Sequence, residues 1–260
     1  MLDDFQLQAI ASLTQGHSVV VSAPTGSGKT VIGEYAIHRA IAHGQKVFYT
    51  TPLKALSNQK LRDFKEQFGL ENVGLLTGDL SLNRDASVVV MTTEIFRNML
   101  YAEFDADDDP LADVETVVLD ECHYMNDSQR GTVWEESIIH CPSSIQFVAL
   151  SATVANAGQL TDWIQKVHGP TDLVSSDFRP VPLDFKFCSK KGLHPLLNDQ
   201  ATGLHPNNKV WRAPKGQRRK GRFSKPPQPE SPSLSFVIRQ MADRDMLPSI
   251  YFIFSRRGCD

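Results

Sequence analysis

The sequence predicts an α/β fold in which helices flank a doubly wound parallel sheet. Seven short runs rich in β-branched residues recur along the first 190 residues, and most are continuously apolar, as in parallel strands covered on both faces. Helical stretches, clearest at 30–42 and 56–68, separate many of these runs and end near Gly44 and Gly69. Strands that alternate with helices indicate a doubly wound sheet. The expected strands cover 18–22, 46–50, 73–76, 87–91, 116–119, 145–150 and 183–187.

The chain is expected to divide into three parts. Residues 1–189 hold the sheet. Residues 190–247 are expected to form a basic insertion or linker with a short helix at 236–241, because proline, glycine and charge replace apolar periodicity through most of that segment. Residues 248–260 include an apolar run at 250–254 that predicts a fresh buried strand, so they are expected to begin a second domain that the chain does not finish.

Composition excludes several classes of protein. A chain of 260 residues with 41% hydrophobic content can bury one substantial core and part of a second. No apolar run reaches the roughly 18 residues of a membrane helix, and the acidic start does not resemble a signal peptide. The four cysteines show no CxxC spacing, so neither a zinc site nor a disulfide framework is expected. We expect a cytoplasmic protein that is not secreted and has no membrane partner.

The formal net charge of −3 conceals a basic segment. Residues 201–229 contain eight Lys or Arg residues and no Asp or Glu. A solvated connector and an RNA-contacting arm are equally consistent with this composition.

A glycine-rich loop at 23–30, with the sequence Ala-Pro-Thr-Gly-Ser-Gly-Lys-Thr, follows one apolar strand and opens a helix. Glycines let backbone N–H groups turn inward around phosphate oxygens, and the helix N-terminus adds a favourable field. Lys29 is expected to hold the β- and γ-phosphates of a nucleotide, and Thr30 to place its hydroxyl on Mg²⁺. Ala23 stands where the general pattern has glycine, and a purely structural turn is the disfavoured alternative.

Two carboxylates, Asp120 and Glu121, follow three apolar residues, so we expect them at the C-terminal end of a buried strand, where doubly wound folds bind ligands. Asp120 is predicted to associate with Mg²⁺ through a water, and Glu121 to orient and deprotonate the water that attacks the γ-phosphate. A solvated acidic turn is the alternative. His123 is predicted to couple nucleotide state to Ser151 and Thr153, which also follow a strand. Taken alone, such residues would indicate only a capped strand end, and the other motifs favour the coupling role.

Seven motifs in order resemble the motif set of superfamily 2 helicases. They are FQLQAI at 5–10, APTGSGKT at 23–30, TTPLKALSNQK at 50–60, TGD at 77–79, MTTEIFRNML at 91–100, DECH at 120–123 and SAT at 151–153. The motif details and FRPVPL at 178–183 resemble the superkiller-type DExH-box RNA helicases, with a cyanobacterial or plastid branch as one candidate, so a plastid or other organelle is the alternative compartment. Cys122 departs from the frequent valine. The resemblance covers about 2–187, resumes at Pro248, and implies one RecA-like domain and the start of a second RecA-like domain.

The resemblance also implies that ATP is the nucleotide, with Gln6 recognising the adenine and Phe5 packing against it. The expected nucleotide-binding set is Phe5, Gln6, Ala23, Pro24, Thr25, Gly26, Ser27, Gly28, Lys29, Thr30, Asp120 and Glu121. Eight residues are expected to face a nucleic-acid backbone: Pro52, Leu53, Lys54, Thr77, Gly78, Asp79, Thr92 and Thr93. Contacts to phosphates and sugars suit a motor that must grip every step of a strand equally. A solvated side chain or a helix cap is the plain alternative for each of them.

The sequence therefore predicts an ATP-dependent RNA helicase with ATP and Mg²⁺ as cofactors, Lys29, Asp120 and Glu121 as catalytic residues, and single-stranded RNA or an RNA duplex with an overhang as partner. Two alternatives stay open: a DNA helicase of the same superfamily, because 2′-hydroxyl contacts alone separate the two polymers, and a non-catalytic RNA-binding module that uses the basic segment. A second motor domain is expected to supply arginine fingers. A chain that ends at Asp260 is therefore expected to bind Mg-ATP weakly and to hydrolyse it little.

Overall fold

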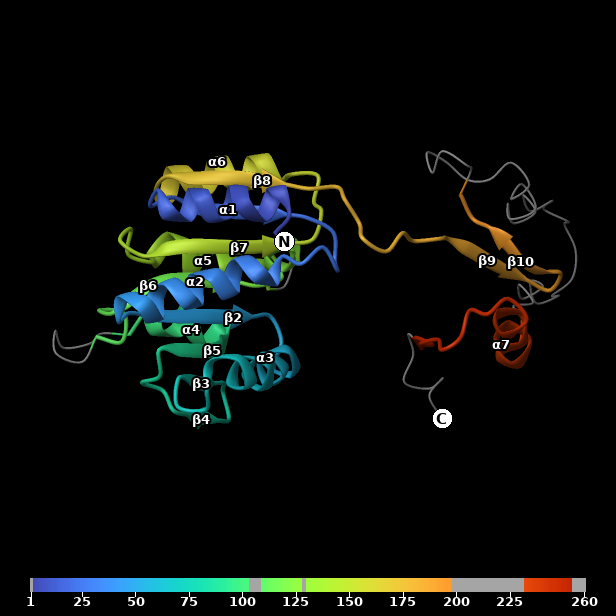
Figure 1. Cartoon of the computed structure of the whole chain (residues 1–260), viewed down its shortest axis with the longest axis horizontal. Helices are drawn as coiled ribbons and strands as arrows, with labels where there is room; N and C mark the ends of the chain where they lie inside the picture. The colour runs from blue at the N-terminus through green and yellow to red at the C-terminus, as the bar shows by residue number, and fades with distance from the viewer. Residues whose placement is uncertain (1, 103–108, 128–129, 198–231, 254–260) are drawn as a thin grey trace, which may run out of the picture. The chain divides into compact units, whose positions relative to one another are not determined.

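The computed structural model describes residues 2–102, 109–127, 130–197 and 232–253 (Figure 1). The chain divides into two compact units, Met1–Val181 and Pro182–Asp260. The basic segment at 201–229 lies outside the described residues, as do residues 254–260. Within the described part of the chain, no helix combines the length and the apolar character needed to cross a membrane.

The first unit is built on an eight-stranded sheet within the described residues, in the order β4-β3-β5-β2-β6-β7-β1-β8 (Figure 1). Every neighbouring pair is parallel except β3 and β4. The strands are β1 (Ser18–Ser22), β2 (Lys46–Thr51), β3 (Val73–Leu76), β4 (Ser81–Leu82), β5 (Val88–Thr92), β6 (Val114–Leu119), β7 (Gln146–Ser151) and β8 (Thr171–Ser175). The predicted α/β fold with a doubly wound parallel sheet is confirmed, with the antiparallel edge strand β4 as the one departure among the described strands.

Helices cover both faces of the sheet. They are α1 (Asp4–Thr14), α2 (Thr30–His43), α3 (Lys54–Phe68), α4 (Thr93–Leu100), the short 3₁₀ helix η1 (Cys122–Asn126), α5 (Gly131–His140) and α6 (Ala157–Val167). One core holds the apolar side chains of α1, α2 and α3, and the other holds those of α4, α5 and α6. Successive strand residues serve opposite faces, so Val19 and Val21 enter the first core while Val20 enters the second.

Two strands of the sheet escape sequence analysis, and one expected strand lies elsewhere. The missed strand β8 is at the edge, with Leu173 and Ser175 exposed, and β4 is exposed and only two residues long. The strand expected at 183–187 is wrong as a member of this sheet. Instead β9 (Lys186–Ser189) pairs with β10 (Gly192–Pro195) in an antiparallel hairpin of the second unit.

The second unit also contains α7 (Leu234–Ala242), which confirms the predicted helix near 236–241. Ser233 caps α7, because its hydroxyl accepts a hydrogen bond from the Phe236 N–H at 3.3 Å. Residues 250–253, expected to open a strand, are exposed and form none in the described part of the chain. A parallel strand requires a neighbour, and no described residue pairs with this segment. The proposed three-part division of the chain remains a prediction.

A buried polar network ties four elements together at the amino ends of the strands. Arg39 on α2 pairs through Nε with Glu115 Oε1 of β6 at 3.0 Å, and their side chains are only 11% and 15% exposed. The same guanidinium donates to the Leu13 carbonyl of α1 at 2.7 Å and to the Gln146 side chain of β7. Removal of Arg39 would take the guanidinium from the buried Glu115 carboxylate and leave the exposed His43 imidazole, 3.1 Å away, beside it.

We expect Arg39→Ala to lower the free energy of unfolding by about 3 kcal/mol, because the buried Glu115 carboxylate loses the guanidinium that compensates its charge. Urea unfolding of the variant and the parent chain measures the difference. Arg62→Ala, at an exposed position of α3, is the control and is expected to change stability by less than about 0.5 kcal/mol. Equal losses in the two variants would contradict the role of the network.

Candidate functional site

The carboxyl edge of the sheet carries the predicted motifs in two adjacent groups. The loops after β1, β6 and β7 carry 23–30, 120–123 and 151–153, and these strands are neighbours in the order β6-β7-β1. The loops after β3, β5 and β2 carry 77–79, 92–93 and 52–54, and these strands are neighbours on the other side. The edge therefore has a half for the expected nucleotide and a half for the expected nucleic acid.

The phosphate loop joins β1 to α2 at this edge (Figure 1). Gly26 and Gly28 have φ of 86° and 84°, which glycine adopts without steric cost. Lys29 lies across the loop, with Nζ donating to the carbonyls of Ala23 at 2.7 Å and Pro24 at 3.0 Å. Burial lowers the pKa of Lys29, while the nearby carboxylates of Glu121 and Asp120 oppose that shift. The ammonium thus lies in a confined site beside two acids.

Gln6 links α1 to the phosphate loop. Its Nε2 donates to the Gly28 carbonyl at 3.0 Å, and its Oε1 accepts from the Asp3 N–H at 2.9 Å. To bind adenine, the Gln6 side chain must either break one of these two hydrogen bonds or make an additional bond from the same atom. Phe5 is 7% exposed within the core, which leaves little of its ring to stack on a base.

Asp120 is held by donors on both oxygens. The buried Tyr49 hydroxyl donates to Oδ2 at 2.8 Å, and the Glu121 N–H donates to Oδ1 at 2.9 Å. A carboxylate oriented in this way can also accept a hydrogen bond from a metal-bound water, because each oxygen has two lone pairs.

Glu121 adopts a left-handed backbone conformation, with φ of 53° and ψ of 41°. Such a conformation is unfavourable for a residue with a Cβ and is concentrated at functional sites. Its Oε2 lies 3.2 Å from His123 Nδ1, and the same nitrogen lies 3.5 Å from the Ala152 N–H. When Nδ1 carries a proton it donates to Glu121, and when it does not it accepts from Ala152. His123 therefore lies between the acidic motif and the segment 151–153, where Ser151 is buried and Thr153 is exposed.

The oxygen donors at this edge suit a nucleotide-bound Mg²⁺. Hydroxyl and carboxylate oxygens are the ligands that this ion and its waters prefer. Lys60 Nζ reaches both candidates, 3.4 Å from Thr30 Oγ1 and 4.0 Å from Asp120 Oδ2, so these two groups lie close together. In the loop, Ser27 Oγ is buried and has no hydrogen-bond partner among the described residues, and a phosphate oxygen can supply one. The residues therefore fit Mg²⁺ carried by a nucleotide.

The nucleic-acid half of the edge presents a mixture of exposed and buried residues. Lys54 and Asp79 are exposed and form an ion pair at 2.8 Å, and Thr77 donates to the same carboxylate oxygen at 3.0 Å. The hydrogen bonds from Lys54 and then Thr77 lower the pKa of Asp79. Exposed ion pairs contribute little to stability, so Lys54 can leave Asp79 for a phosphate at small cost. Leu53 and Gly78 are also exposed.

Three of the predicted contact residues on this half point inward. Thr93 is fully buried, and its hydroxyl donates to the Thr51 carbonyl at 3.3 Å. Pro52 is buried, with its carbonyl accepting from Arg130 at 2.7 Å, and Thr92 is 6% exposed. A nucleic-acid contact at these positions must use the backbone, because the side chains are enclosed.

Comparison with known proteins decides the family. Residues 3–160 match the model of the family described as DEAD/DEAH box helicase. The chain belongs to the DEAD/DEAH box helicase family. The DExH-box ATP-dependent RNA helicase DExH15, chloroplastic, of Arabidopsis thaliana is 44% identical over 100% of this chain and 25% of its own length. The antiviral helicase SKI2 of Saccharomyces cerevisiae is 48% identical over 79% of this chain and 16% of its own length.

A solved structure shows the same fold in a helicase. The Mycobacterium smegmatis helicase Lhr bound to ssDNA and AMP-PNP aligns with a TM-score of 0.53 and 28% identity, covering 66% of this chain and 25% of that one. The predicted resemblance to superkiller-type DExH-box helicases is confirmed. The chain spans 25% to 30% of the length of the curated relatives that it matches over its full length, such as DExH15 and the probable helicase HelY of Mycobacterium leprae.

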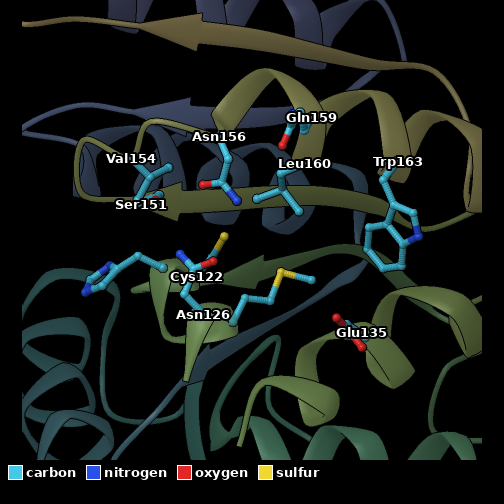
Figure 2. Close-up of a pocket in the computed structure, with 11 residues that line it drawn as sticks. Cys122, Asn126, Glu135, Ser151, Val154, Asn156, Gln159, Leu160 and Trp163 are labelled. Atoms are coloured by element: carbon cyan, nitrogen blue, oxygen red, sulfur yellow. The ribbon is translucent and has the colours of Figure 1, made fainter. Parts of the chain in front are cut away.

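A pocket of about 250 Å³ lies between η1, α5 and α6 of this helicase domain (Figure 2). Asn126, Asn156 and Trp163 line it together with Cys122 and Ser151. Burial raises the pKa of the Cys122 thiol to about 12, which argues against a reactive thiolate at this position. The pocket thus borders both the acidic motif and the segment 151–153.

Two residues at the nucleotide half of this helicase domain escape sequence analysis, Tyr49 and Lys60. Tyr49 is in an apolar strand, where an aromatic residue suggests only packing, yet its hydroxyl meets Asp120. Lys60 is on α3 at three- and four-residue spacing from the buried Ser57 and Phe64, so it shares their face. The one sequence signal for Lys60 is a lysine on a helix face that is otherwise buried, because a lysine in such a position needs a hydrogen-bonding or charged partner.

We expect Tyr49→Phe to lower the free energy of unfolding at pH 8 by about 1–3 kcal/mol, because Asp120 loses a buried donor. Burial, followed by the charge of Asp120, raises the pKa of Tyr49 well above its ordinary value of 10.0. The neutral Tyr49 hydroxyl therefore stabilises the fold fully below pH 10 and progressively less as the pH rises above 10. The Tyr49→Phe variant has no hydroxyl to ionise and is not expected to lose this stability at high pH. Urea unfolding between pH 8 and 11 measures both effects. Tyr35→Phe, at a half-buried surface tyrosine, is the control, and parallel pH curves for all three proteins would contradict this account.

Proposed function

We propose that this chain is the ATP-binding half of an ATP-dependent RNA helicase. The observation that carries the proposal is the meeting of the phosphate loop and the acidic motif at one edge of the sheet, where Lys60 contacts both Thr30 and Asp120. The curated relatives named as ATP-dependent RNA helicases support the choice of reaction.

The proposed roles follow from the positions of the side chains. Lys29 binds the β- and γ-phosphates, with the backbone N–H groups of the loop and Gln6 completing the nucleotide site. Glu121 orients the attacking water and accepts its proton at a carboxylate oxygen, as its place beside His123 allows. Thr30 and, through a water, Asp120 would hold Mg²⁺, which would supply positive charge for the phosphates. His123, Ser151 and Thr153 transmit the state of this site to the neighbouring half of the edge.

The nucleic-acid strand is proposed to follow the loops after β2, β3 and β5. Lys54 and Leu53 offer exposed side chains there, Gly78 offers exposed backbone, and Pro52, Thr92 and Thr93 contribute backbone groups. Such contacts read phosphate and sugar and not sequence. They do not by themselves distinguish RNA from DNA, and the Lhr relative was solved with ssDNA.

The test is Mg²⁺-dependent ATP hydrolysis by a protein that carries this chain together with a second motor domain, with single-stranded RNA or single-stranded DNA added. Stimulation by RNA and little by DNA is the result expected of an RNA helicase. Equal or greater stimulation by DNA would favour a DNA helicase. No hydrolysis under any condition, combined with RNA binding by the basic segment, would favour a non-catalytic binding module.

A further inference from the structure

Lys60 is in an unusual environment for a lysine. It is on the face of α3 that also carries Ser57 and Phe64, both fully buried against the sheet. Its side chain is only 17% exposed, although lysine side chains usually extend into solvent. A cation so placed requires compensating partners.

Its partners are the two groups that are proposed to hold Mg²⁺. Nζ donates to Thr30 Oγ1 at 3.4 Å and lies 4.0 Å from Asp120 Oδ2. The rings of Tyr49 and Phe64 lie 5.4 Å and 5.6 Å from Nζ, within the range of favourable cation–π contact. The ammonium therefore bridges the phosphate loop and the acidic motif from the side of α3.

Two cations cannot share these oxygens without repulsion. A metal ion that uses Thr30 and a water on Asp120 would lie within a few ångströms of Nζ, where like charges repel strongly in a partly buried site. The lysine stem has four methylene groups and can swing its ammonium away from a more highly charged competitor. A purely structural ion pair would instead stay in place when nucleotide binds.

We propose that Lys60 is the resident counter-cation of Thr30 and Asp120, and that binding of Mg²⁺ with the nucleotide displaces its ammonium from that pair. The inference rests on the proposed nucleotide site and adds a positioning residue to it. Lys60 keeps the two groups together before the metal arrives, and it sets how much Mg²⁺ the site requires. In the absence of metal, the positive charge of the Lys60 ammonium favours binding of the nucleotide phosphates.

The coupling between Mg²⁺ and nucleotide tests this role without any measurement of hydrolysis. The quantity is the ratio of the Kd for fluorescent N-methylanthraniloyl-ADP in EDTA to its Kd in saturating Mg²⁺. Lys60→Met removes the ammonium that competes with Mg²⁺. Binding of the probe in EDTA is then expected to weaken, because the phosphates lose that positive charge, whereas binding in Mg²⁺ keeps the metal as its main cation. The ratio is expected to rise about tenfold or more, the scale of one partly screened charge.

Three further proteins make the result decisive. Lys60→Arg keeps the charge and is expected to hold the ratio near that of the parent, whereas Lys60→Gln keeps a donor for Thr30 without the charge and is expected to resemble Lys60→Met. Arg62→Met removes a charge from an exposed position on the same helix and is expected to change nothing. An unchanged or reduced ratio in both uncharged variants would overturn the role of Lys60. Failure of the parent chain to bind the probe in Mg²⁺ would instead overturn the proposed nucleotide site.

Discussion

Replacing Lys29 by alanine is expected to weaken nucleotide binding by about 10²-fold or more. ATP hydrolysis by a protein with both motor domains is expected to fall by a similar factor. This is the size of effect found when one hydrogen-bond donor that stabilises negative charge is removed from a site that excludes water. The reason is local. The Lys29 ammonium lies over the phosphate loop, bonded to the Ala23 and Pro24 carbonyls, and it is close enough to Asp120 and Glu121 for their charges to act on its pKa. Without it, the phosphates approach two carboxylates with less compensating charge.

The measurement is equilibrium binding of labelled ADP by the 260-residue chain, followed by steady-state hydrolysis in the longer protein. Lys46→Ala is the matched control, because Lys46 is the first residue of β2 and lies at the amino ends of the strands, away from the nucleotide site. There it pairs with Asp113 at 4.0 Å. The control is expected to bind nucleotide as the parent does. Similar losses in the two variants would show that the effect of Lys29 is general destabilisation and not phosphate binding.

The central strands could be predicted because their sequences are continuously apolar. Parallel strands between two layers of helices bury both faces, so β1 and β3 coincide with the predicted runs at 18–22 and 73–76. The edge strand β8 lacks that signal because Leu173 and Ser175 face solvent. The strand expected at 183–187 overlaps β9, which pairs with β10 and not with the main sheet, because an apolar run indicates a strand but not the sheet to which it belongs.

The candidate site shows the same limit. The phosphate loop and the acidic motif are local patterns, and their residues are found where the flanking strands and helices indicate. Tyr49 and Asp120 are 71 positions apart in sequence, and their hydrogen bond depends on β2 and β6 being neighbours in the sheet. The order of strands in a sheet cannot be predicted from any local sequence pattern. Contacts between segments that follow different strands, including those of Lys60, are therefore seen only in the folded structure.

Replacing Glu121 by glutamine is expected to reduce ATP hydrolysis by about 10²- to 10⁴-fold in a protein with both motor domains, the range attributed to a positioned general base. Nucleotide binding by the same variant is expected to stay within about threefold of the parent, because the amide keeps the size of the side chain and removes one negative charge from beside the phosphates. This separation of chemistry from binding distinguishes Glu121 from Lys29, whose loss affects both.

The backbone at position 121 makes the variant informative. Glu121 has a φ of 53°, and its N–H is fixed to Asp120 Oδ1 at 2.9 Å, so glutamine retains the same turn and the same donor. Glu66→Gln, at an exposed position of α3, removes a carboxylate elsewhere and is expected to hydrolyse ATP at the parent rate. Single-turnover hydrolysis with saturating Mg-ATP measures the chemical step, and labelled-ADP binding measures affinity. A Glu121→Gln protein that retains full hydrolysis would remove Glu121 as the base and leave water activation to another group at this edge of the sheet.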